Sequence, residues 1–446
     1  MDLLEALGPK ISQEFASRRL ELPVAYHWGE DAAERLAAGI AGLGARSVLV
    51  FSDRRTRVAG LRCFEALAVT SLQIEERCIP DRPGGRSPVC DDLTRESLSK
   101  DLPKADCFVA VGAGVVNDLT KWLAADAGVP YAVYATAASM NGYTAANVAP
   151  SLKGVKSLFR ARAPRLLAAD PRVVCSAPFE LTSSGLGDAI AKPVSTADWK
   201  MNEILFGEAF SDAVAGVIND VEPRYVDAPA ALARREPQAI RALFDALVYS
   251  GCAMTLQGSS LPASGGEHLV SHTLDMLAHV DGVEHDLHGR QVGVATVLAA
   301  AMYEELLAID RPRWSADPGV PFDPNLWKGI AGAVKAEHDK KRERMAQACR
   351  RLSEPGVWDQ VRSALRPLLR SPESIRQCLK VSGSAWRFSD LGCSRERFVT
   401  ALIHCAGIRG RFTSIDLAWA AGLLPGAVER LVDRWAMDDE ARASRE

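Results

Sequence analysis

The sequence predicts an α/β fold, with an N-terminal doubly wound, Rossmann-like domain followed by an all-α C-terminal domain. Two observations lead to this prediction. Short apolar runs alternate with helical patterns through the first third of the chain, and strand patterns almost vanish after residue 178. Strands alternating with helices are typical of a parallel sheet, and helical periodicity without strands is typical of a bundle. The expected domains are residues 1–174 and 175–446.

Four short runs predict the strands of the first domain. Residues 46–51 and 72–78 are the first two, and residues 129–134 are the last. The clearest is residues 107–112, CFVAVG, an apolar run that stops on glycine. The helical pattern of residues 113–127 follows it directly. Each run is short enough for a buried strand of a parallel sheet.

Long helical patterns predict the second domain. Apolar residues recur at helical spacing over residues 240–254, 289–307 and 398–406. Residues 336–351 are densely charged with both signs. Mixed charge of this kind is typical of a solvated helix face, with an anion-binding surface as the functional alternative.

Composition excludes several classes of protein. The chain has 446 residues, 48% hydrophobic and 24% charged, with a net charge of -3, which gives no reason to expect nucleic-acid or membrane binding. The N-terminus has early acids and no long apolar run, so we expect no signal peptide and no membrane span. Ten cysteines without a CxxC pair predict reduced thiols. The expected location is the cytoplasm.

A glycine-rich turn lies where the predicted strand 107–112 meets the next helix. Gly112 and Gly114, on either side of Ala113, let the backbone turn tightly, and the following helix presents free N–H groups to a pyrophosphate. Asn117 stands where the dinucleotide fingerprint has its third glycine, and Asp118 follows it. The turn is therefore a candidate for nucleotide binding, and a purely structural turn is the alternative.

Asp53 follows an earlier predicted strand. A carboxylate at such a strand end often binds an adenosine ribose, and the alternative is a helix or turn cap. Arg54 and Arg55 come next and could accept a 2′-phosphate. The sequence leaves NAD and NADP both open.

Five of the eight histidines lie within 21 residues, between His268 and His288. His268 and His272 are four residues apart and share one face of a helix. His279 and His285 are expected on a polar loop. Two imidazoles and one carboxylate with an open position are typical of a catalytic divalent metal site. Packing or solvent-facing histidines are the alternative.

Asp188 is the carboxylate candidate for this site. It lies in a segment with two glycines, Gly185 and Gly187, which we expect to bring the start of a helix close to a ligand. Asp188 would then point from the first turn of that helix. A capping role for its side chain is the alternative.

Six motifs in this order resemble one family, the iron-containing alcohol dehydrogenase superfamily, and within it the sn-glycerol-1-phosphate dehydrogenases. The resemblance covers residues 48–424. The motifs are Gly112–Lys121, Ala135–Tyr143, Gly185–Asp188 with Lys192 and Ala197–Lys200, Gly266–His272, Leu287–Gly289, and Ile408–Thr413.

The resemblance implies a divalent metal bound by Asp188, His268 and His288, and NAD or NADP across the glycine turn, with Thr136 and Ser139 near the cofactor. It also implies a site in the cleft between an α/β domain and a helical domain. Zinc is the expected metal, and iron and nickel would accept the same ligands. Relatives are often homo-oligomers, so we expect one here.

The implied reaction is a nicotinamide-linked dehydrogenation or carbonyl reduction of a small molecule, with the metal as a Lewis acid. His272, one helical turn past His268, is a candidate proton relay that also faces the substrate. Lys192, one turn past Asp188, is a candidate for binding the substrate or cofactor, and a surface lysine is the alternative.

The loop of residues 135–143 departs from the family pattern. Asn141 replaces an aspartate that faces the substrate, and Ala135 and Ala138 replace two prolines. The expected substrate is therefore glycerol 1-phosphate with dihydroxyacetone phosphate, or a related small polar alcohol and aldehyde. Two alternatives stay open, a dehydroquinate-synthase-like lyase and a non-catalytic relative that binds nucleotide and metal.

Overall fold

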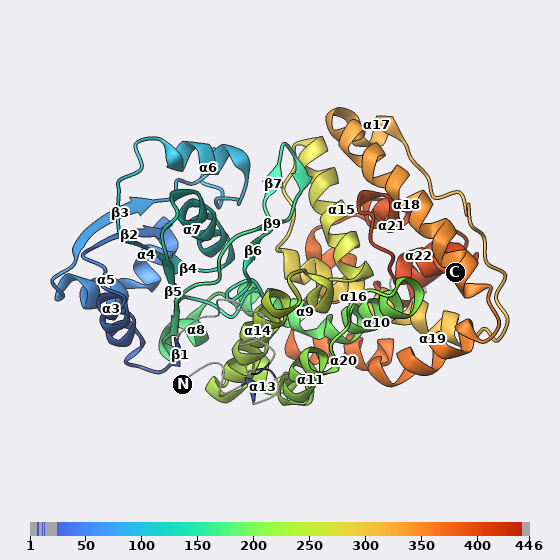
Figure 1. Cartoon of the computed structure of the whole chain (residues 1–446), viewed down its shortest axis with the longest axis horizontal. Coiled ribbons are helices and arrows are strands. Elements are labelled where there is room, and N and C mark those ends of the chain that lie inside the picture. Colours follow the sequence, from blue (N-terminus) through green and yellow to red (C-terminus); the bar gives the residue numbers. More distant parts are fainter. Residues whose placement is uncertain (1–6, 9–10, 12, 14–24, 439–446) are drawn as a thin grey trace. The chain divides into compact units, whose positions relative to one another are not determined.

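The computed structural model describes residues 7–8, 11, 13 and 25–438, and the chain packs into two compact units (Figure 1). Unit 1 comprises residues 1–185 and 216–259, and unit 2 comprises residues 186–215 and 260–446. Residues 216–259 therefore belong to unit 1, although they lie within the predicted second domain. The predicted domain division at residue 174 stays a prediction. The prediction that the N-terminus is not a signal peptide concerns residues that lie mostly outside the described part of the chain.

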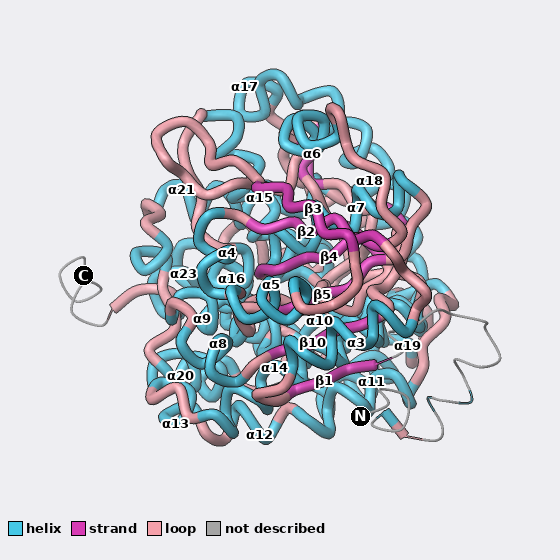
Figure 2. Tube along the Cα trace, turned by 90° about the vertical axis from the view of Figure 1, so that its left-hand side faces the viewer, coloured by secondary structure: helices cyan, strands magenta, loops and turns pink. Residues whose placement is uncertain are grey.

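Unit 1 is built on a six-stranded parallel sheet with the order β1-β10-β5-β4-β2-β3. Figure 2 shows the strands stacked in this order. The strands are β1 (Ala25–Trp28), β2 (Ser47–Ser52), β3 (Gln73–Cys78), β4 (Cys107–Gly112), β5 (Tyr131–Ala135) and β10 (Leu166–Ala169). Short antiparallel pairs join β6 (Asn147–Val148) to β9 (Phe159–Arg160) and β7 (Ser151–Leu152) to β8 (Val155–Lys156).

The predicted strands and fold class are confirmed, with bounds shifted by one or two residues. β4 has the predicted bounds and is buried along its whole length. β3 is mostly exposed because it forms one edge of the sheet. The helices of unit 1 include α3 (Ala32–Gly42), α4 (Arg54–Ala59), α5 (Leu61–Ala68), α6 (Asp92–Ser99), α7 (Gly114–Ala127), α8 (Pro171–Ser176) and most of α9 (Phe179–Ile190).

Side chains from alternate strand positions form the core on one face of the sheet. They include Val48 and Val50 of β2 and Val109 and Val111 of β4, which pack against α3 and α5. Asp106, just before β4, holds the start of β2 beside it. Its Oδ2 accepts the backbone N–H groups of Arg46 (2.8 Å) and Ser47 (2.9 Å). Local alternation and one cross-strand carboxylate thus fix the register of β2 beside β4.

The sheet reverses its winding between β2 and β4. After β2 the chain adds β3 outward, and it then returns to place β4 on the other side of β2. In open α/β sheets, ligands bind beyond the carboxyl ends of the strands at such a switch point. The two predicted nucleotide-binding features, Asp53 after β2 and the glycine turn after β4, both lie at this point.

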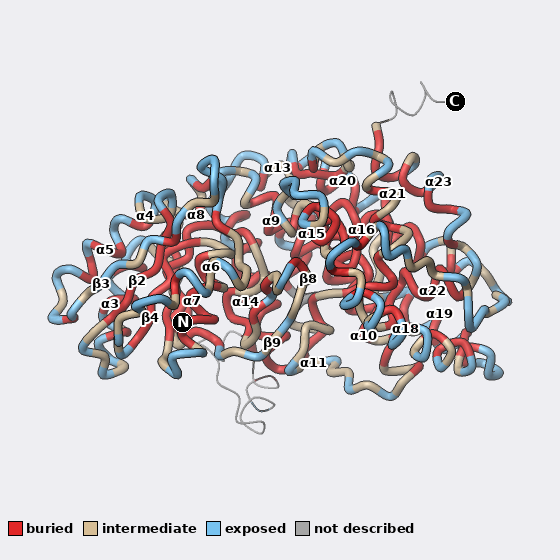
Figure 3. Tube along the Cα trace, turned by 90° about the horizontal axis from the view of Figure 1, so that it is seen from above, coloured by how far each residue is buried: buried red, intermediate tan, exposed pale blue. Residues whose placement is uncertain are grey.

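Among its described residues, unit 2 contains helices and connecting loops but no strand. Its two central helices, α15 and α16, pack against each other and are mostly buried, as the red trace in Figure 3 shows. The helices of more than one turn are the end of α9, α10 (Lys192–Phe206), α15 (Gly266–Asp281), α16 (His288–Leu307), α18 (Ala331–Leu352), α19 (Val357–Leu365), α20 (Pro372–Ser382), α21 (Arg395–His404), α22 (Ser414–Ala420) and α23 (Val428–Trp435).

One helix of unit 1, α14 (Pro237–Gln257), is long and apolar enough to cross a membrane by length and composition. The most apolar part of it is 83% buried inside the structure. A buried core helix of a globular protein passes the same test, so this helix is weak evidence for a membrane span.

Candidate functional site

The glycine turn after β4 opens directly into helix α7. Ala113 is the N-cap residue of α7, and its side chain makes no capping hydrogen bond. The first N–H groups of this 14-residue helix therefore point out of its positive end, as an anion site requires. A Cβ added at Gly112 would lie 2.5 Å from the Cβ of Val116, so only glycine fits there. This geometry supports an approach of a ligand to bare backbone.

The predicted cofactor residues after the turn belong to one hydrogen-bonded group. The Asn117 amide donates to Asp118 Oδ1 (2.9 Å). Lys121 is 1% exposed, and its Nζ donates to the carbonyls of Gly142 (2.7 Å) and Asn147 (3.0 Å). Burial lowers the pKa of Lys121, and the Asp118 charge opposes this shift. Lys121 thus anchors the following loop to α7, a role that sequence reasoning missed.

That loop contains three more predicted site residues, Thr136, Ser139 and Asn141. The Thr136 backbone N–H donates to the Gly112 carbonyl (3.1 Å), which places it beside the turn. Ser139 is buried, with its Oγ 3.5 Å from the Tyr143 hydroxyl. Asn141 is half-buried. The structure therefore brings the loop and the turn together within unit 1.

Asp53 has a structural role in the free protein. It is the N-cap residue of α4, and its Oδ1 accepts the backbone N–H groups of Arg55 (2.7 Å) and Thr56 (2.8 Å). Both neighbouring arginines pair with one carboxylate, Asp81, at 2.8 Å from Arg54 and 2.6 Å from Arg55. The alternative interpretation of Asp53 as a helix cap is therefore confirmed. Asp53 Oδ2 lies outside these cap hydrogen bonds, 3.6 Å from a guanidinium nitrogen of Arg55.

The location of Asp188 corrects one expectation. α9 begins at Phe179, so Asp188 lies in its last turn rather than its first. The glycine before it serves another purpose. A Cβ on Gly187 would lie 1.8 Å from the Gly289 carbonyl oxygen, so the backbones of α9 and α16 touch there. This close approach brings Asp188 next to His288, the first residue of α16.

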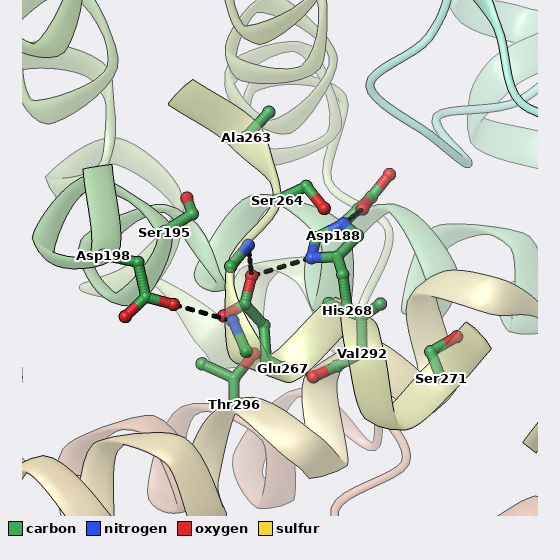
Figure 4. A network of polar contacts seen from close by, with 12 residues as sticks. Asp188, Ser195, Asp198, Ala263, Ser264, Glu267, His268, Ser271, Val292 and Thr296 are labelled. Carbon is green, nitrogen blue, oxygen red and sulfur yellow. Dashed lines mark hydrogen bonds and ion pairs between the residues drawn. The ribbon is translucent and has the colours of Figure 1, made fainter. Parts of the chain in front are cut away.

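Asp188, His268 and His288 come together in unit 2. Each offers one ligand atom, and these atoms all lie within 4.8 Å of one another. His268 Nε2 is 3.3 Å from Asp188 Oδ1, and the rings of His268 and His288 are 5.2 Å apart. Figure 4 shows Asp188 and His268 facing each other. Two imidazoles and a carboxylate at this spacing suit a divalent metal ion.

Both histidine rings are held through their second nitrogen. His268 Nδ1 lies 2.7 Å from Glu267 Oε1, which also accepts the Gly265 N–H (2.7 Å). His288 Nδ1 lies 2.8 Å from the Ser271 hydroxyl. Metal-binding histidines are usually oriented in this way, by a carboxylate or another polar group. The donor set and its supports therefore fit a metal ion.

The electrostatics of the cluster favour positive charge between its members. Burial opposes ionisation of Asp188, but His268, Lys192 and His288 together hold its pKa well below the usual range. Burial also disfavours the cationic form of His268, yet its contacts with Asp188 and Glu267 raise its pKa. A proton on the His268 ring meets the same attraction that a metal cation would meet there.

Four other residues considered in the sequence analysis lie near the cluster or on the same helix and the loop after it. His272 stacks on His288, with ring centroids 5.3 Å apart and planes at 16°. Lys192 is 1% exposed and donates to the Ala263 carbonyl (3.1 Å), so it is not a surface lysine. His279 lies in the last turn of α15 rather than on a loop. His285 is on the loop, where it pairs with Asp275 at 2.9 Å.

Asp198 is a supporting residue that sequence reasoning did not single out, although it belongs to a quoted motif. Its Oδ2 accepts the Gly266 N–H (2.7 Å), and its Oδ1 accepts the Ser414 N–H (2.8 Å) and the Tyr303 hydroxyl. Burial and the nearby Glu267 charge raise the pKa of Asp198 to about 8. Figure 4 shows Asp198 beside the start of α15, the helix that carries His268.

Comparison with known proteins identifies relatives over most of the chain. Residues 27–178 match the family model for iron-containing alcohol dehydrogenases. The glycerol-1-phosphate dehydrogenase [NAD(P)+] of Bacillus velezensis is 32% identical over 370 residues, covering 83% of this chain and 84% of the relative. That of Pyrococcus furiosus is 34% identical over 250 residues, covering 54% of this chain and 69% of the relative.

Solved structures share the fold at low identity. A probable glycerol dehydrogenase from Sinorhizobium meliloti has a TM-score of 0.61 at 18% identity, covering 95% of this chain and 99% of its own. An iron-containing alcohol dehydrogenase from Thermococcus thioreducens has a TM-score of 0.60 at 14% identity, covering 93% and 98%. The chain therefore belongs to the iron-containing alcohol dehydrogenase family and is an oxidoreductase, as its sequence motifs predict.

Proposed function

We propose that this oxidoreductase uses NAD or NADP and one divalent metal ion to interconvert glycerol 1-phosphate and dihydroxyacetone phosphate, or a closely related small polar alcohol and its carbonyl compound. The observation that carries the proposal is the cluster of Asp188, His268 and His288, with ligand atoms within 4.8 Å of one another. The names of the relatives support the substrate and the cofactor.

Asp188, His268 and His288 would hold the metal. Zinc is our first choice, while iron, which the family name suggests, and nickel suit the same two imidazoles and carboxylate. A divalent ion held there supplies Lewis acidity toward an alcohol or carbonyl oxygen. The chain's own contribution is to fix both imidazoles through Glu267 and Ser271, which lowers the cost of assembling the site.

His272 is the proposed proton relay. It follows His268 by one turn of α15, and its ring stacks on His288. Its ring is half-buried, and imidazole is the side chain that most often serves as a general acid or base. Lys192 stays a predicted contact of substrate or cofactor. Its bond to the Ala263 carbonyl supports a second possibility, that it positions the segment leading into α15.

The nucleotide would lie at the switch point of the sheet in unit 1. The backbone of Gly112, Ala113 and Gly114 at the start of α7 is suited to the pyrophosphate. Asn117, Asp118, Thr136 and Ser139 are the proposed polar contacts around it. Asp53 would bind the ribose through Oδ2, which lies outside its cap hydrogen bonds and 3.6 Å from Arg55.

Asn141 is the proposed determinant of substrate preference. It lies in the loop that Lys121 anchors beside the glycine turn. Asn141→Asp introduces a negative charge there without a change of size, so it should change the ratio of kcat/KM values between phosphorylated and neutral substrates by about tenfold. The affinity for NAD, measured by calorimetry, should stay the same. Unchanged selectivity would contradict a substrate-facing Asn141.

We further propose a cytoplasmic, homo-oligomeric enzyme. All ten cysteines are free thiols, and six of them are buried, as expected for a reducing compartment. Sedimentation velocity of the purified protein tests the oligomeric state directly.

A nicotinamide absorbance assay tests the function. NADH and NADPH are supplied with dihydroxyacetone phosphate, dihydroxyacetone or simple aldehydes, with metal-stripped and metal-reconstituted protein. Metal-dependent oxidation with dihydroxyacetone phosphate would support the proposal, and oxidation only with other carbonyls would keep the reaction and change the substrate. Bound nucleotide and metal without net oxidation would favour a lyase that recycles its cofactor, or a non-catalytic relative.

A further inference from the structure

The charged helix α18 lines an open hollow of about 840 Å³ in unit 2. Five of its polar residues share one helix face, because they recur every three or four positions. These residues are Lys340, Glu343, Arg344, Gln347 and Arg350. The opposite wall includes Glu208, Leu261 and Arg411. With one apolar side chain on its walls, this α18 hollow suits a polar, charged ligand.

Two of the four cations on the walls already have carboxylate partners. Arg344 pairs with Glu208, and its guanidinium also lies 3.4 Å from the centre of the Phe206 ring. Lys340 pairs with Glu337 at 2.7 Å. These two pairs neutralise part of the α18 hollow.

The other two cations, Arg350 and Arg411, lack such a partner. Among the residues that the structure describes, no carboxylate lies within ion-pair distance of either guanidinium. Arg411 donates to neutral oxygens, the Ser264 carbonyl (2.5 Å) and the Ser260 hydroxyl (3.2 Å). Burial and the neighbouring Arg409 lower the pKa of Arg411 to about 10, against the opposing charges of Glu208, Asp198 and Glu267.

We propose that the α18 hollow binds a small phosphate-bearing molecule at a site separate from the metal cluster and the nucleotide turn. A guanidinium presents several N–H donors in a fixed fork that matches phosphate oxygens. Arg350 supplies one such fork, and Arg411 adds a second guanidinium whose hydrogen-bond acceptors are neutral oxygens. Glu343 and Gln347 on the same helix face offer acceptors and donors for hydroxyl groups on the rest of the ligand.

The site would act on the segment that leads into α15. Arg411 holds Ser260 and Ser264, and α15 begins two residues later with His268 near its start. A phosphate that draws Arg411 toward the hollow would therefore change the restraints on this segment. The inference goes beyond the proposed reaction and does not depend on its substrate.

Calorimetric titration with inorganic phosphate tests the proposal on the full-length, metal-loaded protein saturated with NAD. We compare the wild type with Arg350→Gln and with the matched control Arg342→Gln, which lies on the same helix, is 63% exposed and pairs with Asp317 outside the hollow. We expect saturable binding that Arg350→Gln weakens about tenfold and Arg342→Gln leaves within about twofold, since one charge-assisted contact is lost.

Hydrogen–deuterium exchange supplies the second readout. Phosphate should slow exchange in residues 260–268 and along α18 in the wild type but not in Arg350→Gln. Equal isotherms for the two variants, including the case of phosphate bound only at the catalytic site, would overturn the proposal. The absence of saturable binding into the millimolar range would do the same. Arg350 is exposed, so its substitution should leave the fold intact.

Discussion

The nucleotide turn of unit 1 and the metal cluster of unit 2 are built in opposite ways. The turn uses backbone and glycine, with Ala113 making no side-chain cap at the start of α7. The cluster uses three side chains, and two of them are oriented by further side chains, Glu267 and Ser271. The comparison shows that the nucleotide turn requires positions without bulky or capping side chains. The metal cluster instead requires particular side chains at particular positions.

One feature is nevertheless shared. A glycine sets the critical approach in each case, at Gly112 beside Val116 and at Gly187 beside Gly289. In the turn the glycine fits against the first turn of its own helix, α7. In the cluster it allows two helices, α9 and α16, to touch. A substitution at Gly112 should therefore affect nucleotide binding alone, and a substitution at Gly187 should affect metal binding.

The largest effect is expected at the metal ligands. Asp188→Asn or His268→Ala should lower kcat/KM at least about a thousandfold, or about 4 kcal/mol, because the Lewis acid is lost. Metal content should fall in parallel, while circular dichroism and NAD affinity stay near those of the wild type. Inductively coupled plasma mass spectrometry after dialysis measures the metal.

His279→Ala is the matched control for this experiment. His279 lies on the same helix, in its exposed last turn. The control variant should keep both its metal and its activity. Full activity in Asp188→Asn would show that the assigned cluster is not the metal site.

A weaker but still large effect is expected at Gly187. Gly187→Ala places a Cβ 1.8 Å from the Gly289 carbonyl, so α9 and α16 must move apart. We expect a loss of about 1–3 kcal/mol in the free energy of unfolding and metal affinity weakened about 10- to 100-fold. Chelator competition measures the affinity, and urea denaturation measures the stability.

Gly216→Ala is the control for the Gly187 variant. Gly216 also lies within a helix, α11 (Asp212–Val221), but none of the side chains and backbone atoms that the structure describes lies within 4 Å of an added Cβ. Alanine there should raise stability by about 0.5–1 kcal/mol because glycine is a poor helix former. If both variants behaved alike, helix propensity rather than close approach would explain the result.

The third prediction concerns the turn alone. Gly112→Ala brings a Cβ to 2.5 Å from the Cβ of Val116 and should weaken NAD binding about tenfold. Metal affinity should not change, because this glycine belongs to unit 1. Calorimetry with NAD and a chelator competition assay provide the two readouts. A parallel loss of metal would contradict the separation between the two sites.

The smallest effect is expected at Asp106, away from both sites. Hydrogen bonds from Arg46 and Ser47 lower the pKa of this carboxyl. A depressed pKa contributes stability above the unfolded-state pKa near 3.8, and this contribution is lost as pH falls through the folded-state value. Asp106→Asn should therefore be less stable than the wild type near neutral pH, and urea denaturation should show the gap closing below about pH 4. A gap that widened on acidification would contradict this assignment.

Several features of both units could be predicted because their signals are local. Strand β4 is an uninterrupted apolar run that ends on glycine, and its observed bounds equal the predicted ones. The i, i+4 spacing of His268 and His272 likewise fixes a shared helix face before any tertiary contact is known. These patterns require only the periodicity of one element.

The misjudged features depend on contacts between distant residues. Gly187 looks like a helix start, but it lies inside α9, where its missing side chain lets Gly289, about a hundred residues later, approach. Lys192 could not be recognised as buried, because its partner is a backbone carbonyl 71 residues away. Backbone acceptors leave no trace in side-chain patterns, so such burial is invisible in a single sequence.

The contact between Gly187 and Gly289 has a consequence for protein design. Grafting Asp188, His268 and His288 onto another helical scaffold would transfer the ligands without the distance that joins them. The graft would also need two helices able to meet backbone to backbone, which means carrying Gly187 as well, since alanine there would clash with the carbonyl of residue 289. The unit to transfer therefore includes a residue that contributes no functional group at all.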